Sequence, residues 1–265
     1  MGERYAVIGN PIAHSLSPRI HALFARATGQ DIEYGCIEAA LDGFAAAVAR
    51  WRAEGGRGLN VTLPFKQQAF ELCTRVSDRA RAAGVVNTLD LDKGFGDNTD
   101  GVGLVQDLAV NLGVALKGKN ALLMGAGGAA QGVVGALLET GLARLVIANR
   151  TLERAQALAG RFSGVAARGY AALAGERFDL VVNATSAGLQ GEGPALPEGI
   201  LGRHTLAYDM VYARDTPFLV AARRAGAVAS DGLGMLVEQA AESFFLWRGV
   251  RPATRPVLEE LRRAR

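Results

Sequence analysis

The stretch from Leu122 to Gly132 constrains the fold most, because an apolar run leads directly into closely spaced glycines and then into small residues. This pattern is typical of the turn between a β-strand and an α-helix that binds a dinucleotide. Glycines permit the sharp turn and the close approach of a pyrophosphate, and the helix N-terminal amides face its negative charge. The spacing is Gly-x-Gly-Gly-x-Ala rather than the commoner Gly-x-Gly-x-x-Gly, so a tight packing turn is the alternative interpretation.

The next apolar run, residues 143–148, indicates which dinucleotide is bound. It ends about 20 residues past the glycines, where this fold places the residue that contacts the ribose. The chain has Asn149, Arg150 and Thr151 there, with Arg154 one helical turn later and no carboxylate at the strand end. Because guanidinium groups pair well with phosphate, the sequence predicts NADP rather than NAD. A solvated arginine at a strand end is the alternative.

Length and composition limit the class of protein. The 265 residues, 49% of them hydrophobic, suffice for one large or two small domains with a substantial core. A net charge of +3 without long basic runs favours anionic small molecules over nucleic acid. No apolar run reaches membrane-spanning length, and the N-terminus lacks a signal-segment pattern. Cys36 and Cys73 have no metal or redox spacing, so we expect buried, reduced thiols in a cytoplasmic protein.

Alternating strand and helix patterns predict an α/β protein with two units and a cleft between them. In the first unit we expect strands at residues 4–9, 31–37, 58–63 and 85–89, and helices at residues 17–28, 41–51, 66–73 and 78–83. Beyond the first unit we expect strands before residue 125 and at 143–148, 178–185, 205–210 and 227–230, and helices at 102–116, 154–159, 217–225, 235–247 and 256–263. The turn-rich segment 93–101 marks the boundary. Ligands of such sheets bind where the strands end.

Polar stretches lie at several of these strand ends and helix starts. Ser15 and Ser17 next to a helix N-terminus suit a carboxylate, although simple N-capping would also account for Ser17. Lys66 follows the third strand, Asp100 lies in a glycine turn, and Gln239 is a polar residue in an apolar helix. Taken singly, these three are explained equally well as a surface lysine, a turn aspartate and a helix edge.

Taken together, these stretches resemble the shikimate dehydrogenase family over almost the whole chain. The resemblance is carried by motifs at residues 9–18, 60–66, 87–88, 98–101, 149–151, 183–186, 208–212, 216–219, 232–235 and 239–241. No motif position has a substitution that suggests an inactive enzyme.

The resemblance implies a substrate-binding catalytic domain of residues 1–101, completed by 235–265, and a Rossmann domain of residues 102–234 that binds NADP. It implies reversible, NADPH-dependent reduction of 3-dehydroshikimate to shikimate, on the pathway to chorismate and the aromatic amino acids, with Lys66 and Asp100 as the catalytic pair. The implied substrate contacts are Ser15, Ser17, Thr62, Lys66, Asn87, Asp100, Tyr212 and Gln239. The implied cofactor contacts are Gly125, Ala126, Gly127, Gly128, Ala129, Asn149, Arg150, Thr151, Arg154, Met210, Gly232 and, on the cofactor side, Asp78.

Lysine and aspartate suit this chemistry. Ketone reduction places negative charge on oxygen, which an ammonium stabilises and protonates while a carboxylate holds the ammonium. The sequence leaves open which of the two gives the proton. The three histidines, His14, His21 and His204, have no metal-ligand spacing, so we expect no metal. The alternative functions are a quinate or dual quinate/shikimate dehydrogenase and a non-catalytic NADP-binding regulator. We expect the protein to be a monomer or a homodimer.

Overall fold

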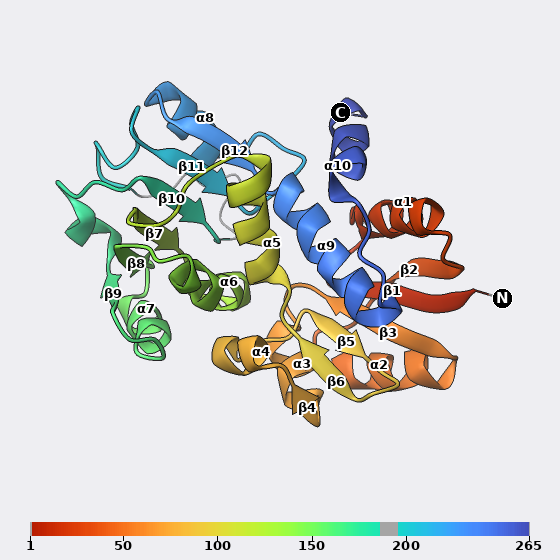
Figure 1. Cartoon of the computed structure of the whole chain (residues 1–265). Coiled ribbons are helices and arrows are strands. Elements are labelled where there is room, and N and C mark those ends of the chain that lie inside the picture. The colour runs from red at the N-terminus through yellow and green to blue at the C-terminus, as the bar shows by residue number, and fades with distance from the viewer. Residues whose placement is uncertain (1, 186–195, 265) are drawn as a thin grey trace. The chain divides into compact units, whose positions relative to one another are not determined.

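A computed structural model describes residues 2–185 and 196–264 (Figure 1). The chain forms two compact units. Unit 1 consists of Met1–Gly103 and Leu236–Arg265, and unit 2 of Leu104–Met235. Part of the expected motif at residues 183–186 lies outside the described residues.

Unit 1 is built on a mixed six-stranded sheet in the order β2-β1-β3-β5-β6-β4. Its strands are β1 (Glu3–Gly9), β2 (Ile32–Glu38), β3 (Gly56–Val61), β4 (Arg75–Val76), β5 (Thr88–Asp90) and β6 (Phe95–Asp97). The first three are parallel, as the strand–helix alternation predicts, whereas β5 runs antiparallel to β3 and β6.

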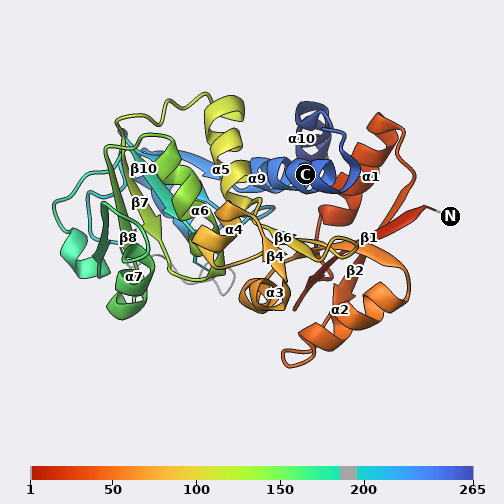
Figure 2. The same cartoon turned by 60° about the horizontal axis from the view of Figure 1, so that its bottom comes forward.

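Helices cover both faces of the unit 1 sheet. They are α1 (Ser17–Thr28), α2 (Phe44–Ala53), α3 (Lys66–Leu72), α4 (Asp78–Ala83), α10 (Thr254–Arg263) and most of α9 (Leu233–Arg248). Figure 2 shows α2 and α3 on one face and α1, α9 and α10 on the other. Because side chains alternate along a strand, Ala6 and Ile8 of β1 pack in the same core as Phe44 and Phe65. Tyr5, the residue before Ala6 on β1, stacks on Trp247 of α9 with ring centroids 4.7 Å apart.

Three expectations for local structure in unit 1 are wrong. The strand expected at 85–89 begins only at Thr88. The expected boundary turn contains β6, whose Gly96 packs so closely that a Cβ would lie 2.4 Å from the sulfur of Cys73. A packing glycine was therefore interpreted as a turn glycine. Cys36 is exposed and Cys73 half-buried, so neither thiol is fully buried. Cys36 is exposed because β2 is an edge strand.

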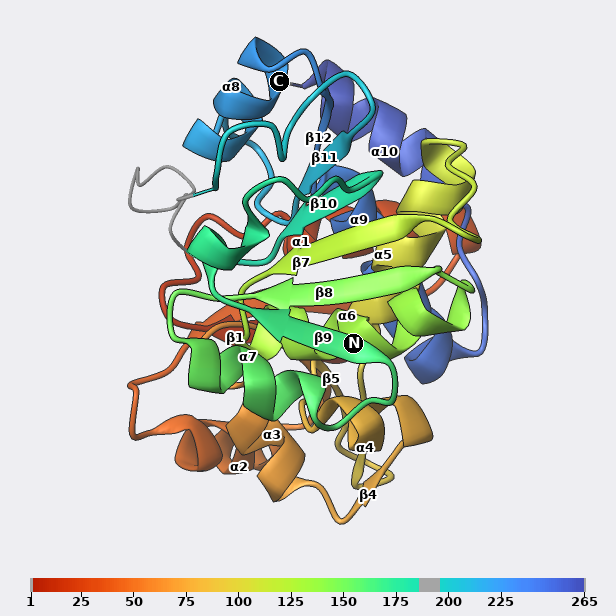
Figure 3. The same ribbon diagram turned by 90° about the vertical axis from the view of Figure 1, so that its left-hand side faces the viewer.

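Unit 2 is a parallel six-stranded sheet in the order β12-β11-β10-β7-β8-β9 (Figure 3). Its strands are β7 (Asn120–Met124), β8 (Arg144–Ala148), β9 (Val165–Arg168), β10 (Leu180–Asn183), β11 (Leu206–Asp209) and β12 (Val228–Asp231). The helices α6 (Gly128–Glu139) and α7 (Leu152–Ala159) pack on one face and α8 (Pro217–Arg224) on the other. This doubly wound order has its switch point between β7 and β10, where such sheets bind ligands.

The helix expected at 102–116 is shorter and starts earlier. It consists of α5 (Asp100–Gln106) followed by one π-helical turn, Asp107–Asn111. Asp107 is buried and accepts a hydrogen bond of 2.6 Å from the hydroxyl of Tyr208 on β11. Among residues 2–185 and 196–264, no helix is long and apolar enough to cross a membrane.

Candidate active site

The loops after β1 and β3 lie side by side at the carboxyl edge of the unit 1 sheet. The two strands pair in parallel, Ile8 opposite Val61, so their following loops leave the sheet together. A Cβ on Gly9, the last residue of β1, would lie 2.5 Å from the methyl group of Thr62. This proximity brings the loop that carries the predicted serines next to the segment that carries Thr62 and Lys66.

The serine loop corrects one expectation. Leu16, not Ser17, is at the N-cap of α1, and Ser17 is a buried residue of the first turn beside Pro18. The hydroxyl of Ser15 accepts a hydrogen bond of 3.2 Å from the backbone N–H of Ser17. Ser15 therefore satisfies one of the helix N-terminal amides, the role that the sequence had assigned to Ser17.

Lys66 and Asp100 form an ion pair. Lys66 begins α3 and Asp100 begins α5, and Lys66 Nζ lies 2.5 Å from Asp100 Oδ2. Their side chains are only 12% and 7% exposed. The side-chain oxygen of Asn98 accepts a hydrogen bond from the backbone N–H of Asp100 and fixes the start of α5. Little water surrounds the pair, so its charges act more strongly than those of a surface pair.

Asn87 and Gln239 join this pair. Asn87 Nδ2 donates to Asp100 Oδ1 at 2.9 Å and lies 3.4 Å from Gln239 Oε1. Gln239 comes from α9 and is 8% exposed, so it is part of the polar cluster and the helix-edge interpretation is wrong. The structure thus brings four of the predicted residues together, from α3, α5, α9 and the segment before β5.

A further group of buried polar residues in unit 1 had no predicted role. They are Tyr34, Asn60, Thr88, Thr99 and Ser243, and hydrogen bonds link all five. Asn60, Thr88 and Ser243 interrupt otherwise apolar strand and helix patterns. A polar residue inside an apolar pattern was the signal available, because a buried polar group needs a partner.

The glycine-rich turn of unit 2 fits a dinucleotide. Gly125 has φ +104°, and a Cβ there would lie 3.1 Å from the carbonyl oxygen of Ala184, directly after β10. Only glycine fits this position at the switch point. A Cβ on Gly127 would meet open space, and the first turn of α6 carries no acidic residue or side-chain cap. Within the part of the chain that the structure describes, no side chain caps the N-terminal amides of α6, which therefore suit a phosphate. Ala126, Gly128 and Ala129 complete the turn.

Two arginines follow β8 at the same edge of the unit 2 sheet. Arg150 lies beyond the strand end and Arg154 in α7, and both are exposed. Neither forms an ion pair with any residue that the structure describes. Asn149 Nδ2 donates to the carbonyl oxygen of Thr151 at 2.9 Å and fixes the turn between β8 and α7. This arrangement suits a phosphate on the ribose.

Other predicted residues are distributed over both units. A Cβ on Gly232 would lie 2.4 Å from the carbonyl oxygen of Met210, so glycine is required for these two loops of unit 2 to approach each other. Tyr212 is half-buried in the loop after β11. Asp78 is in unit 1, exposed in the first turn of α4, where a carboxylate complements the helix N-terminus.

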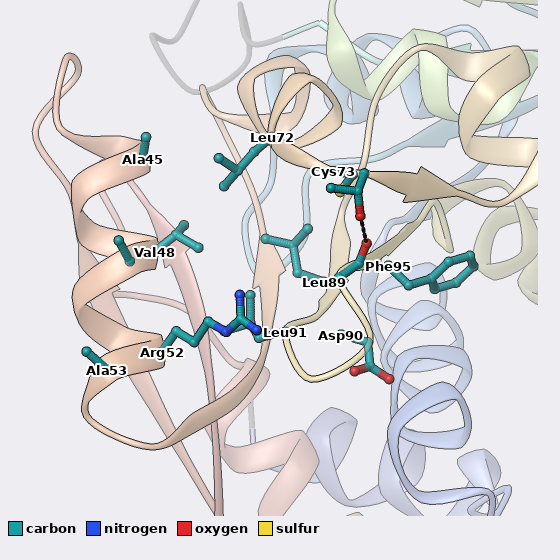
Figure 4. Close-up of a pocket in the computed structure, with 13 residues that line it drawn as sticks. Ala45, Val48, Arg52, Ala53, Leu72, Cys73, Leu89, Asp90, Leu91 and Phe95 are labelled. Atoms are coloured by element: carbon teal, nitrogen blue, oxygen red, sulfur yellow. Dashed lines mark hydrogen bonds between the residues drawn. The ribbon is translucent and has the colours of Figure 1, made fainter.

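A separate hollow of about 610 Å³ in unit 1 lies between α2 and the β5–β6 hairpin (Figure 4). Its lining is mainly aliphatic, with Val48, Leu72 and Leu91 among the labelled side chains. None of the predicted site residues lines it. Because it lacks the predicted catalytic residues, the polar cluster is the better candidate for the chemistry. Among the described residues, no group of three or more His, Cys, Asp or Glu side chains is arranged to hold a metal ion.

Unit 2 has a Rossmann-type fold with a turn suited to a phosphorylated dinucleotide, and unit 1 carries a shielded lysine–aspartate pair. Together these features define a dinucleotide-dependent oxidoreductase. Family models match three segments of the chain. The shikimate dehydrogenase substrate binding domain matches residues 7–89, the shikimate/quinate 5-dehydrogenase model residues 107–190, and the shikimate 5′-dehydrogenase C-terminal domain residues 232–262. The chain therefore belongs to the shikimate dehydrogenase family.

Individual relatives agree with this assignment. The shikimate dehydrogenase (NADP⁺) of Dechloromonas aromatica is 56% identical, with 99% of this chain and 98% of the relative aligned. The shikimate 5-dehydrogenase of Thermus thermophilus, solved with NADP(H) and shikimate, is 38% identical over 99% of this chain and all of its own, with a TM-score of 0.89. An Ael1 enzyme from Pseudomonas putida is 50% identical over 98% of each chain, with a TM-score of 0.92.

Proposed function

We propose that this chain is an NADP-dependent shikimate dehydrogenase that reversibly reduces 3-dehydroshikimate to shikimate. One observation carries the proposal: Lys66 and Asp100 form a shielded ion pair next to Asn87 and Gln239, in a chain of this family. The product lies on the pathway to chorismate and the aromatic amino acids.

Lys66 and Asp100 are the proposed catalytic residues. Bound NADPH supplies the hydride. The Lys66 ammonium then stabilises the negative charge that develops on the ketone oxygen and donates a proton to it. Asp100 holds Lys66 Nζ at 2.5 Å and keeps it oriented. In the reverse direction the same pair accepts the hydroxyl proton.

Unit 1 is the proposed substrate domain. Ser15 and Ser17 at the start of α1 suit the shikimate carboxylate, because two hydroxyls and helix N-terminal amides all donate hydrogen bonds. We assign the ring hydroxyls or the carboxylate to four further side chains: Thr62, Asn87, Tyr212 and Gln239. Tyr212 comes from unit 2, so its place here rests on family resemblance alone.

Unit 2 is the proposed NADP domain. The turn Gly125–Ala129 and the α6 amides would hold the pyrophosphate, and Asn149, Arg150, Thr151 and Arg154 would hold the adenosine ribose with its 2′-phosphate. We assign Met210 and Gly232 to the nicotinamide side and Asp78 to the cofactor side, on family resemblance.

One assay tests the activity. The purified protein is mixed with shikimate or quinate and with NADP or NAD, and the formation of reduced cofactor is followed by absorbance. We expect the highest kcat/KM with shikimate and NADP. Equal turnover of quinate would make this a dual enzyme, and the absence of turnover by folded protein that binds NADP would support a regulator instead.

Two further properties are proposals. We propose a cytoplasmic location, where thiols stay reduced, because Cys36 and Cys73 are both free. We propose a monomer or a homodimer, which sedimentation equilibrium would distinguish from larger assemblies.

A further inference from the structure

A second layer of polar side chains lies behind the catalytic pair in unit 1. Thr88, on β5, contacts Asn87 but neither Lys66 nor Asp100: its hydroxyl lies 2.9 Å from Asn87 Oδ1. Asn87 Nδ2 in turn donates to Asp100 Oδ1 at 2.9 Å. Thr88 has no exposed surface, so no substrate can reach it directly.

Hydrogen bonds from neighbouring residues fix the orientation of the Asn87 side-chain amide. Asn87 Nδ2 donates to Thr99 Oγ1 and to Asp100 Oδ1, both at 2.9 Å, and lies 3.4 Å from Gln239 Oε1. Asn87 Oδ1 accepts from the backbone N–H of Thr99 and from the hydroxyl of Thr88, both at 2.9 Å. These contacts hold the amide in one orientation. The flipped amide would place its oxygen against the Asp100 carboxylate, acceptor against acceptor.

The Thr88 hydroxyl links Asn87 to Asn60 and Ser243. Asn60 Nδ2 donates to Thr88 Oγ1 at 3.2 Å, and the hydroxyl of Ser243, which donates to the carbonyl oxygen of Gln239 at 3.0 Å, lies 2.7 Å from Thr88 Oγ1. Asn60 is itself oriented, because Tyr34 donates to its Oδ1 at 2.7 Å and stacks on His21 with ring centroids 4.1 Å apart. Thr88 Oγ1 thus accepts from Asn60, and its hydroxyl donates to Asn87 Oδ1 at 2.9 Å.

We propose that Thr88 is a positioning residue of the reaction: it fixes the orientation of the Asn87 amide, which fixes the Asp100 carboxylate against Lys66. The inference rests on the proposed function, since Asp100 matters only if the Lys66–Asp100 pair does the chemistry. This role needs the hydroxyl of Thr88 and not only its volume. Valine has nearly the shape of threonine without the hydroxyl, so it would satisfy packing but not this role.

The test compares Thr88→Val with Thr88→Ser. Thr88→Val should lower kcat about three- to tenfold, the factor that corresponds to one net hydrogen bond, with KM for NADP unchanged. Thr88→Ser keeps the hydroxyl and should retain kcat within about twofold of wild type. The matched control is Thr205→Val in unit 2, which removes an equally buried hydroxyl bonded to the carbonyl oxygen of Phe178. The control should lower Tm but not kcat.

A second comparison separates positioning from general loosening. In an Asp100→Asn background, Thr88→Val should have no further effect on kcat, because the group through which it acts is already gone. If Thr88→Val lowers kcat by the same factor in both backgrounds, or if Thr88→Ser is as slow as Thr88→Val, the inference is wrong.

A measurement that does not depend on turnover distinguishes failure of this inference from failure of the proposed function. The side-chain amide protons of Asn87, followed by NMR, should exchange faster in Thr88→Val than in wild type or Thr88→Ser. If wild type fails to oxidise shikimate, the proposed function fails while the amide exchange still tests the link from Thr88 to Asn87. Unchanged exchange in Thr88→Val would overturn that link whatever the activity.

Discussion

Lys66 Nζ lies 2.5 Å from Asp100 Oδ2, although 34 residues separate the two in the sequence. The first residue of α3 and the first residue of α5 thus form one ion pair at the carboxyl edge of the unit 1 sheet. Lys66→Ala and Asp100→Asn should each lower kcat by about 10²–10⁴-fold, the range for a positioned acid or base. The double variant should be hardly slower than the slower single variant, because groups that act together are not additive. Losses in kcat that multiply would instead assign the two residues independent roles, and circular dichroism would check that each variant is folded.

Cofactor preference should depend on the exposed arginines after β8. Arg150→Ala should reduce the ratio of kcat/KM for NADP to that for NAD by about ten- to a hundredfold, mainly through KM, since charge-assisted hydrogen bonds contribute about 1.5–3 kcal/mol. Arg154→Ala should act in the same direction. The control is Arg224→Ala, an exposed arginine at the end of α8, which should leave the ratio unchanged. An unaltered ratio in Arg150→Ala would remove this residue from the cofactor site.

The serine loop should separate substrate binding from stability. Ser15→Ala and Ser17→Ala should both raise KM for shikimate and leave KM for NADP near wild type. Because Ser15 accepts the Ser17 N–H, Ser15→Ala should also lower the free energy of unfolding by about 1 kcal/mol, whereas Ser17→Ala should cost less. Steady-state kinetics and urea titration measure the two effects. Equal loss of substrate and cofactor affinity in folded Ser15→Ala would count against a carboxylate site.

Acid should destabilise the protein through His21. Burial lowers the pKa of this imidazole to about 3, against an ordinary value of 6.5. Below pH 6.5 the unfolded chain binds a proton that the folded chain does not, so stability falls as pH falls toward 3. Between pH 7 and pH 5 this amounts to about 2 kcal/mol, at about 1.4 kcal/mol per pH unit.

The variant His21→Phe, which suits the surrounding aromatic rings, should lose this part of the pH dependence. The exposed His14, replaced by Gln, serves as control and should keep it. Urea unfolding at pH 5, 6 and 7 measures both variants. A wild-type slope retained by His21→Phe would mean that other groups cause the acid sensitivity.

Sequence patterns predicted the parallel parts of both sheets well, because buried parallel strands are continuous apolar runs. The runs before Gly125 and Asn149 became β7 and β8. The patterns failed where strands are short. Phe95–Asp97 has no apolar run and forms β6 only because β5 and β4 pair with it. Arg75–Val76 and Val165–Arg168 are likewise short, and each forms an edge strand by pairing with one neighbouring strand.

The sequence by itself determined the dinucleotide turn and the residue types of the site. A glycine at a left-handed turn and arginines at a strand end act locally, so they can be recognised from neighbours in the chain. Only the tertiary structure decided which residues meet. Asp100 reaches Lys66, and Gln239 reaches Asn87, across 34 and 152 residues of sequence. It also decided that Thr88 and Ser243 are buried partners of Asn60, because a hydrogen bond between distant segments depends on how strands pair and helices pack, and no local pattern records that.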